Sequence, residues 1–158
     1  TSYIYCNIIM YGCICYLFVK YIGVVDMATK PANAEQKRFM SSISDFIQEV
    51  GLGGLYGPEY ENRFDFQIHH VLGRSAKHNK VAIGHWFIIP VPVELHDVSS
   101  NHELNVTHHK KAFVKEFGQQ CGIFQILYSC MVQWNKYSNN NFTIPSMEVY
   151  EAIMDTRA

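Results

Sequence analysis

The sequence has few cysteines, and their arrangement excludes two common kinds of small protein. Its 158 residues include five cysteines, an odd number at irregular spacing: Cys6, Cys13, Cys15, Cys121 and Cys130. A secreted domain held together by disulfides has a dense and even set. A cysteine-rich zinc knuckle is also disfavoured, because none of the five lies near the histidines. We therefore expect a reducing, cytoplasmic compartment.

The chain also lacks a strong charge of either sign, since its formal net charge is -1. Nothing in the composition indicates a protein coated with basic residues, but a nuclease needs only a local cationic stripe. The short run Arg74, Lys77, His78 and Lys80 is such a stripe. A solvated loop is the alternative interpretation. We find no internal repeat.

One long hydrophobic run is present between residues 3 and 25, where Lys20 is the only charge. Such a run could span a bilayer. It could also be a buried or interfacial strand pair, or a segment that is no natural part of the protein. Because residues 27–31 (MATKP) look like a fresh N-terminus, we favour the third interpretation and assign 1–26 to an apolar extension. Residues 27–158 are then predicted to form a single domain.

Apolar periodicity predicts a helix near the start of this domain. Apolar residues recur at three- and four-residue steps from Phe39 to Val50, with Asn33 as the predicted N-cap and Gly51 as the predicted stop. The glycine-rich stretch that follows is predicted to be a flexible connection.

Alternating apolar and polar residues from Phe64 to Ile68 predict a strand that runs directly into two adjacent histidines. A polar loop is expected at 73–80, followed by an apolar, β-prone segment at 81–93. The prolines of that segment prevent a central strand over its full length. The remaining elements are expected to be a short helix near 94–96, a helix from Val106 or Thr107 that Gly118 and Gly122 could divide, and a short helix from 144–146 to Asp155.

All eight histidines lie between His69 and His109. Histidine switches readily between proton donor, proton acceptor and metal ligand near neutral pH. Core packing or solubility would scatter histidines along the chain, so their confinement indicates a site. The order of parts, which is strand, His-His, loop, strand and then a histidine on a helix, resembles that of the ββα-metal nuclease site.

The chemistry of phosphodiester cleavage explains this order. The reaction needs an activated water and stabilisation of the negative charge on the leaving oxygen. A neutral imidazole, with an ordinary pKa of about 6.5, supplies the base, and a divalent cation supplies the charge. Because adjacent residues at a strand end point to opposite faces, one of His69 and His70 could bind metal while the other faces substrate.

Short segments of the chain resemble a known nuclease family. Residues 68–70 (IHH) resemble the opening of HNH endonucleases, while 84–90 (GHWFIIP) and 93–96 (VELH) resemble their middle and final segments. With the later 113–118 (FVKEFG), the set is similar to the Ref-like family, phage recombination-enhancement nucleases that depend on a recombinase filament. The match spans roughly 64–118. It implies an α+β fold with a ββα-metal (HNH-like) core and flanking helices.

The resemblance implies a metal-dependent HNH-type DNA endonuclease, which hydrolyses phosphodiester bonds in phage recombination or DNA processing. His69 and His96 would hold a divalent metal ion, either Mg²⁺ or Mn²⁺ or else Zn²⁺. His70 would be the general base that activates water. His85 would orient this base or contact phosphate.

The implied partner is DNA, contacted by Arg74, Lys77 and Lys80. A recombinase-coated single-strand filament is a further expected partner, in the host cell cytoplasm if the protein is phage-encoded. The sequence leaves the oligomeric state open.

One feature of the family is missing from this chain. Its members commonly carry a Cys-x-x-Cys/His pair around the last motif, often holding a structural zinc. Pro92 and Leu95 stand at those positions here. Apolar packing by Trp86, Phe87 and Val93 is expected to replace the zinc.

Two other functions remain open. A catalytically inactive relative of the same fold would bind DNA or a recombination protein without cutting. A small membrane-anchored protein could instead store or sense metal through its histidines, which requires insertion of 3–25. Asp97 and Glu103 are alternative oxygen ligands for a hard cation, although solvated acids are the simpler interpretation. Surface or N-cap positions are expected for His102, His108 and His109, and core positions for Trp86, Trp134, Cys121 and Cys130.

Overall fold

The computed structural model describes residues 30–158, of which Ala32–Ala158 form one compact unit of helices and short strands. The predicted α+β class is thereby confirmed. The apolar extension predicted at 1–26 lies outside the described residues. Between residues 30 and 158, no helix combines the length and the apolar character that a membrane crossing needs.

The first described helix, α2 (Ala34–Val50), begins and ends where the sequence predicts. The Asn33 side chain accepts a hydrogen bond from the Gln36 N–H at 2.8 Å, and the Gln36 side chain accepts one from the Asn33 N–H at 2.9 Å. These two bonds form a capping box, which satisfies two backbone donors at once. Gly51 ends the helix with a φ of 72°, in the left-handed region that favours glycine. The buried face of α2 consists mainly of Phe39, Ile43, Phe46 and Ile47.

The prediction of a flexible connection after α2 is wrong. This segment contains α3 (Gly53–Tyr56) and a 3₁₀ helix (Pro58–Tyr60). Leu52, Tyr56 and Tyr60 anchor it because their side chains are buried in the core. The burial of these large side chains outweighs the conformational freedom of the glycines between them.

Two antiparallel strands, β1 (Phe66–His70) and β4 (Ile88–Pro92), form the sheet that carries the paired histidines. The register places His69 and His70, the last residues of β1, opposite the first two residues of β4. Every residue of β4 is buried, whereas β1 is partly exposed. The paired histidines therefore lie at one end of the sheet, beside a strand that the core holds in place.

The prolines of β4 are compatible with this strand because the sheet has only two strands. Among residues 30–158, no strand pairs with the second edge of β4, so a missing proline N–H disrupts no ladder there. The Pro90 carbonyl instead accepts a hydrogen bond from the buried Tyr56 hydroxyl at 2.7 Å. As expected, the segment at 81–93 is not one strand over its full length, but the break falls between β3 (Val81–Ala82) and β4, and both prolines lie within β4.

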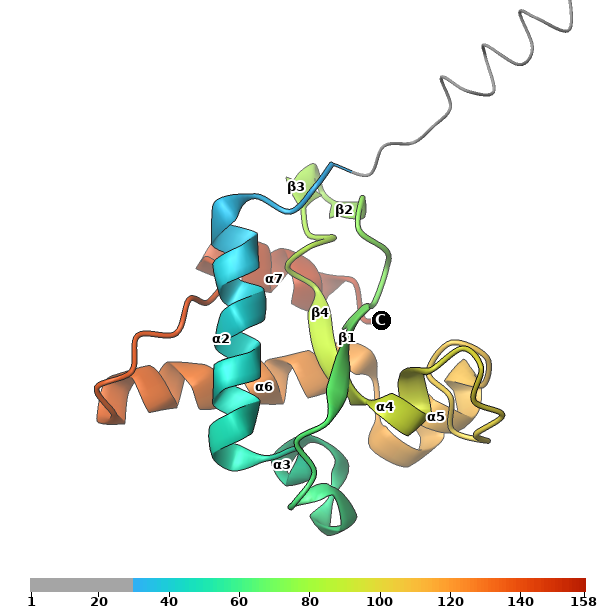
Figure 1. Ribbon diagram of the computed structural model, residues 1–158. Coiled ribbons are helices and arrows are strands. Elements are labelled where there is room, and N and C mark those ends of the chain that lie inside the picture. Colours follow the sequence, from blue (N-terminus) through green and yellow to red (C-terminus); the bar gives the residue numbers. More distant parts are fainter. Residues whose placement is uncertain (1–29) are drawn as a thin grey trace, which may run out of the picture. The chain divides into compact units, whose positions relative to one another are not determined.

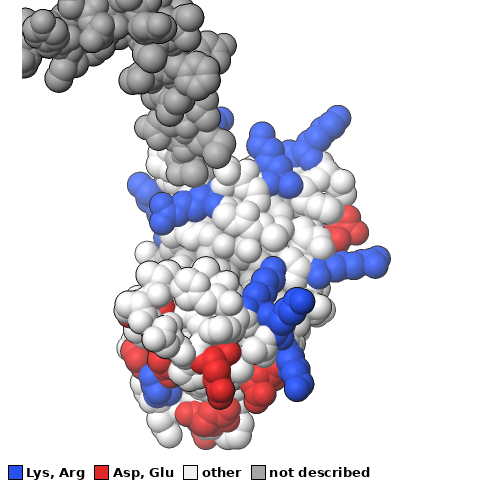
Figure 2. All heavy atoms as spheres, turned by 90° about the vertical axis from the view of Figure 1, so that its right-hand side faces the viewer, with Lys and Arg blue, Asp and Glu red and all other residues white. Residues whose placement is uncertain are grey.

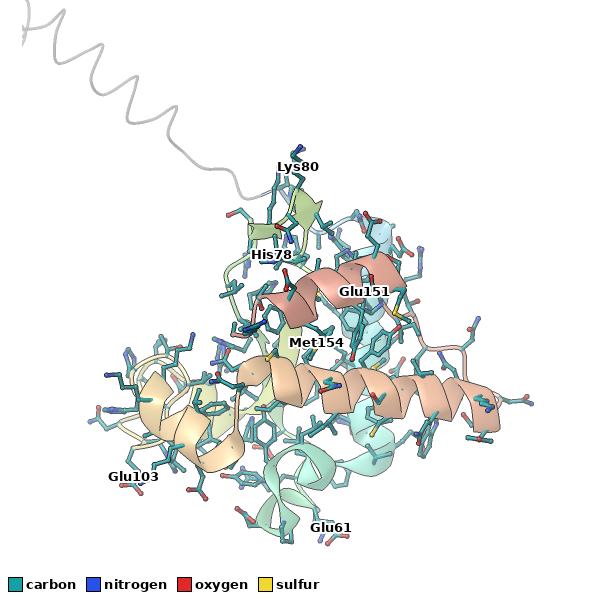
Figure 3. The ribbon with its side chains drawn as sticks, turned by 180° about the vertical axis from the view of Figure 1, so that it is seen from behind. Glu61, His78, Lys80, Glu103, Glu151 and Met154 are labelled. Carbon is teal, nitrogen blue, oxygen red and sulfur yellow. The ribbon has the colours of Figure 1, made fainter. Side chains whose placement is uncertain are left out.

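The predicted polar loop between the two strands contains a small hairpin, β2 (Lys77–His78) and β3 (Val81–Ala82). Asn79 and Lys80 form its turn, with φ values of 48° and 70°. Turns of this kind twist in the same sense as the strands they join. Strands of two residues have too little periodicity to be predicted from sequence. The hairpin packs on α7 (Met147–Asp155), as Figure 3 shows from behind.

After β4 the chain forms α4 (Val93–His96), α5 (Lys110–Phe117) and α6 (Gln120–Tyr137), and then α7. The short helix expected near 94–96 is confirmed. The next helix begins at Lys110, later than predicted. It ends at Gly118, whose φ of 86° lies in the left-handed region and separates α5 from α6. Gly122 lies within α6 and does not interrupt it.

The core lies between α2, the sheet and α6, which crosses behind the strands in Figure 1 and contacts β4, α3 and α7. Trp86 and Phe87 are buried in it as predicted, whereas Val93 is only partly buried. Cys121 is buried as predicted, but the core assignment of Cys130 is wrong, because this residue faces solvent on α6. Periodicity alone does not distinguish the two faces of an apolar helix.

Candidate functional site

The candidate site is built around the end of β1, where His69 and His70 project to opposite faces of the strand. Both side chains are partly buried. Each of them meets one further histidine, so four of the eight histidines form two pairs.

The first pair joins His69 to His96, the last residue of α4. Their ring centroids are 5.3 Å apart and their planes are inclined at 72°. The pair forms because α4 begins directly after Pro92 and turns the chain back over β1. Gln67, two residues before His69 on the same face of β1, approaches the Nδ1 atom of His96 with its Oε1 at 2.6 Å.

The second pair joins His70 to His85. The Nε2 atom of His70 lies 3.3 Å from the Nδ1 atom of His85, and the ring centroids are 5.3 Å apart. His85 is buried, with 8% of its surface exposed. Gly84 allows this arrangement, because a Cβ at that position would collide with the carbonyl groups of Gly73 and Arg74.

The pKa values of the first pair favour neutral rings. The pKa of His69 is lowered to about 4, first by burial and then by the nearby His96, His70 and Lys110. Burial also lowers the pKa of His96, while the Asp97 carboxylate acts in the opposite direction. Both rings are therefore neutral near pH 7, as a metal ligand must be.

The pKa of His70 is also lowered to about 4, first by burial and then by His85, Arg74 and His96. A neutral imidazole at this position has a lone pair that can accept a proton. Arg74 is exposed and close enough to His70 to affect its pKa, which places one cation beside the second pair. Lys110 is likewise close enough to His69 to lower its pKa.

A divalent cation fits the first pair chemically. The His96 Nδ1 atom is engaged by Gln67, which leaves its Nε2 atom for a ligand bond. Among residues 30–158, no three His, Cys, Asp or Glu side chains are grouped closely enough to form a complete metal site. Two imidazoles would hold an ion whose remaining positions are filled by water or substrate oxygens.

The two acidic residues considered as alternative ligands have other environments: Asp97 is engaged by Ser99, and Glu103 is exposed. The Asp97 carboxylate accepts hydrogen bonds from the backbone N–H and the hydroxyl of Ser99, at 2.9 and 2.8 Å. Glu103 is exposed on the loop that precedes α5 (Figure 3). Within residues 30–158, neither carboxylate belongs to a group of three His, Cys, Asp or Glu side chains that could hold a metal ion, so the geometry gives the oxygen-ligand alternative no support.

The predicted DNA-contacting residues are all exposed. Lys77 and Lys80 lie on the β2–β3 hairpin, which is anchored to α7 through Asp155. The Asp155 carboxylate is 2.7 Å from the His78 Nε2 atom and accepts a hydrogen bond from the Asn79 side chain at 3.2 Å. Within the described chain, no hydrogen bond joins Lys77 or Lys80 to the four paired histidines. Figure 2 shows Lys and Arg side chains projecting from the face that bears α4, α5 and this hairpin.

Three further residues contribute to the site without a signal in the sequence. Gln67 and Gln120 accompany the first pair, and Asn105 organises the loop after it. Gln120 is 1% exposed, and its side chain favours the protonated form of His69. Its Oε1 atom, however, makes no hydrogen bond of ordinary geometry with any described residue. A single glutamine has no pattern that would identify it in advance.

Asn105 is fully buried and holds the loop that follows His96. Its Oδ1 atom accepts hydrogen bonds from the N–H groups of Thr107 and His108 at 2.9 and 3.0 Å, and its Nδ2 group donates to the Asp97 carbonyl at 2.9 Å. These bonds form the turn that delays the start of α5.

The other four histidines, His78, His102, His108 and His109, belong to neither pair. His78 belongs to the hairpin, and the Nδ1 atom of His102 accepts a hydrogen bond from the Leu104 N–H at 3.1 Å. His108 and His109 are exposed, and His109 is the N-cap residue of α5. The surface and N-cap positions expected for these two are confirmed.

A cavity of about 470 Å³ lies between α2, α3 and α6, with a mainly apolar lining that includes Phe46, Leu55 and Trp134. It contains no histidine. The chemically distinctive side chains of the described residues are therefore at the end of β1 and not in this cavity.

Comparison with known proteins yielded no relative: no family model, curated protein or solved structure matches the chain.

Proposed function

We propose that this protein is a metal-dependent DNA endonuclease with a ββα-metal (HNH-like) core, which hydrolyses phosphodiester bonds. The observation that carries the proposal is the division of the adjacent histidines into two pairs. One pair has the chemistry of a metal site, and the other has that of a supported general base. The succession of β1, β4 and α4 also supports it, because two antiparallel strands followed by a helix are the parts of such a core.

In the proposed reaction, His70 takes a proton from water as the water oxygen forms a bond to phosphorus. The bond between phosphorus and the leaving oxygen breaks, and the leaving oxygen gains a proton from solvent. His85 positions His70 through the contact between Nδ1 and Nε2. In this arrangement the proton between the two rings is on the His70 Nε2 atom, and the lone pair on the His70 Nδ1 atom is free to take the proton from water. His85 then accepts the hydrogen bond from His70 and stabilises the imidazolium that forms.

His69 and His96 would hold the divalent ion, for which Mg²⁺, Mn²⁺ and Zn²⁺ are the candidates. When bound, the ion stabilises the negative charge that develops on the phosphate and on the leaving oxygen. The neutral state of both rings near pH 7 favours this role, since a protonated imidazole has no lone pair to donate.

Arg74, Lys77 and Lys80 would contact the DNA backbone. Arg74 affects the pKa of His70 directly, so its guanidinium is well placed to bind the phosphate beside the base. The anchored hairpin presents the two lysines at a stable position relative to α7. Phosphate contacts of this kind orient a duplex without selecting its sequence.

The decisive experiment measures cleavage of plasmid and single-stranded DNA by the full chain with Mg²⁺, Mn²⁺, Zn²⁺ or EDTA. His70→Ala should lower the rate by about 10² to 10⁴, the usual contribution of a general base. His109→Ala is the matched control, because this exposed histidine belongs to neither pair. Cleavage that EDTA and His70→Ala abolish, and that His109→Ala retains, would support the proposal.

Two results would contradict it. Full activity of His70→Ala would exclude this residue as the base. The absence of cleavage by folded protein with any of these ions, on naked DNA and on recombinase-coated single strands alike, would exclude the nuclease. DNA binding without cleavage would then identify a catalytically inactive binding protein of the same fold.

A further inference from the structure

A short hydrogen bond to a paired histidine comes from a residue to which the proposed function gives no role. Gln67 lies on the exposed face of β1, and its Oε1 atom is 2.6 Å from the Nδ1 atom of His96. This is slightly shorter than the usual range of about 2.7 to 3.2 Å for a hydrogen bond between nitrogen and oxygen. Because a carbonyl oxygen can only accept, the hydrogen must be on the histidine nitrogen.

We propose that Gln67 is a positioning residue, which fixes His96 in the tautomer that carries its proton on Nδ1. The Nε2 lone pair is then permanently available to a divalent cation shared with His69. The inference rests on the proposed function insofar as it makes His96 a ligand. The tautomer itself follows from the amide oxygen of Gln67 facing the His96 Nδ1 atom.

The placement of Gln67 follows from the geometry of the strand. Residues two apart on a strand share a face, so Gln67 and His69 point to the same side of β1. The immediate passage from β4 into α4 brings His96 over that side, where it meets both residues. One strand face therefore supplies both a ligand and the acceptor that orients the second ligand.

The neighbouring carboxylate does not perform this task. Asp97 follows His96 directly, but its Oδ1 atom accepts both hydrogen bonds from Ser99. Among the described residues, it is the Gln67 side chain that accepts the hydrogen bond from the His96 Nδ1 atom. A hydrogen bond from the outer nitrogen of a ligand histidine to such an acceptor is a general way to fix its ring and tautomer.

The amide is also distinct from a carboxylate at this position. A glutamine oxygen accepts the proton without adding a negative charge beside the rings of His69 and His96. The alternative amide orientation would present an N–H₂ group to His96 and place the ring proton on Nε2. These two arrangements make opposite statements about which nitrogen is free, so a tautomer measurement separates them.

The test uses NMR of nitrogen-labelled histidine in the full chain with EDTA, at mildly alkaline pH where the rings are neutral. The expected result is a His96 with its proton on Nδ1 in the native protein and in Gln67→Glu. In Gln67→Met, the proton should redistribute between the two nitrogens. Gln125→Met, on the exposed surface of α6, is the matched control and should match the native protein. A native His96 with its proton on Nε2 would overturn the inference.

Calorimetric titration with Mn²⁺ alone then tests the consequence for the site. Loss of the acceptor at the outer nitrogen should weaken Mn²⁺ binding by about 10- to 100-fold in Gln67→Met. Gln67→Glu should bind at least as tightly as the native protein, and Gln125→Met equally tightly. Unchanged affinity in a folded Gln67→Met would overturn the positioning role.

The failure of the proposed function would look different. A native protein that binds no Mn²⁺, but shows His96 protonated on Nδ1, would refute the metal site and retain the hydrogen bond from His96 to Gln67. If the native protein binds Mn²⁺, and the Gln67 variants show the same His96 tautomer and the same Mn²⁺ affinity, the metal site would be retained and the positioning role of Gln67 refuted.

Discussion

Replacement of Tyr56 by phenylalanine isolates one buried hydrogen bond that supports the strand leading to His96. The Tyr56 side chain is 4% exposed, and its hydroxyl donates to the Pro90 carbonyl at 2.7 Å. Its ring also packs against Tyr60, Phe113 and Phe117. Phenylalanine retains those ring contacts, so the substitution removes the hydroxyl and little else.

The magnitude follows from the carbonyl that is left behind. Without the hydroxyl, the Pro90 carbonyl loses its side-chain donor in a buried strand. An unsatisfied buried polar group costs about 1 to 3 kcal/mol. For a domain of this size, that corresponds to a decrease in melting temperature of about 3 to 12 °C. Because burial raises the pKa of Tyr56, the hydroxyl stays protonated, and this stabilisation should persist from neutral pH up to about pH 10.

The assay is chemical denaturation of the native chain, Tyr56→Phe and Tyr60→Phe, followed by circular dichroism. Tyr60 is the matched control, because it lies in the same aromatic cluster and no described residue binds its hydroxyl. The free energy of unfolding should decrease in Tyr56→Phe and change little in Tyr60→Phe. Equal effects of the two substitutions would refute the assignment of this energy to the bond with Pro90.

Three further predictions concern the candidate site. In EDTA, the free energy of unfolding should decrease as pH falls from about 6.5 towards 4, because the lowered pKa of His69 disfavours protonation of the folded state. This one residue contributes at most about 3 kcal/mol, reduced by solvent screening. His69→Gln should therefore flatten the profile of urea midpoint against pH. Gly84→Ala should destabilise the protein and displace the Arg74 segment, because the added Cβ meets backbone atoms. Gly122→Ala is the control, since open space surrounds that position, and a native melting temperature in Gly84→Ala would contradict the prediction. Joint replacement of Lys77 and Lys80 by alanine should weaken DNA binding and reduce the slope of log affinity against log salt by about 1.8 in duplex DNA, and an unchanged slope in fluorescence anisotropy titrations would exclude both lysines from the interface.

The sequence alone was sufficient for the elements whose signals are local. The capping residue Asn33 and the stop at Gly51 determine the bounds of α2, because they satisfy or terminate hydrogen bonds within a few residues. Apolar alternation likewise predicts β1 and its continuation into the adjacent histidines. The short helix predicted from 144–146 to Asp155 is α7, and the structure shows that Ser146 caps it.

Local signals failed where burial decided the outcome. The glycines after α2 indicate flexibility, yet Leu52 and Tyr56 hold that segment against the core. The start of α5 was predicted too early because the turn before it depends on the side chain of Asn105. Cys121 and Cys130 occupy similar apolar surroundings in sequence, but only the first faces inward.

The candidate site shows the same division. The confinement of the histidines and their adjacency at the end of a strand are properties of the sequence, and they identify His69 and His70 as candidates without any structure. Only the tertiary structure decides which partner each one meets, and that Gln67 binds His96. The reason is physical: the face on which a side chain lies is determined by backbone periodicity, whereas its partner is determined by how distant segments pack.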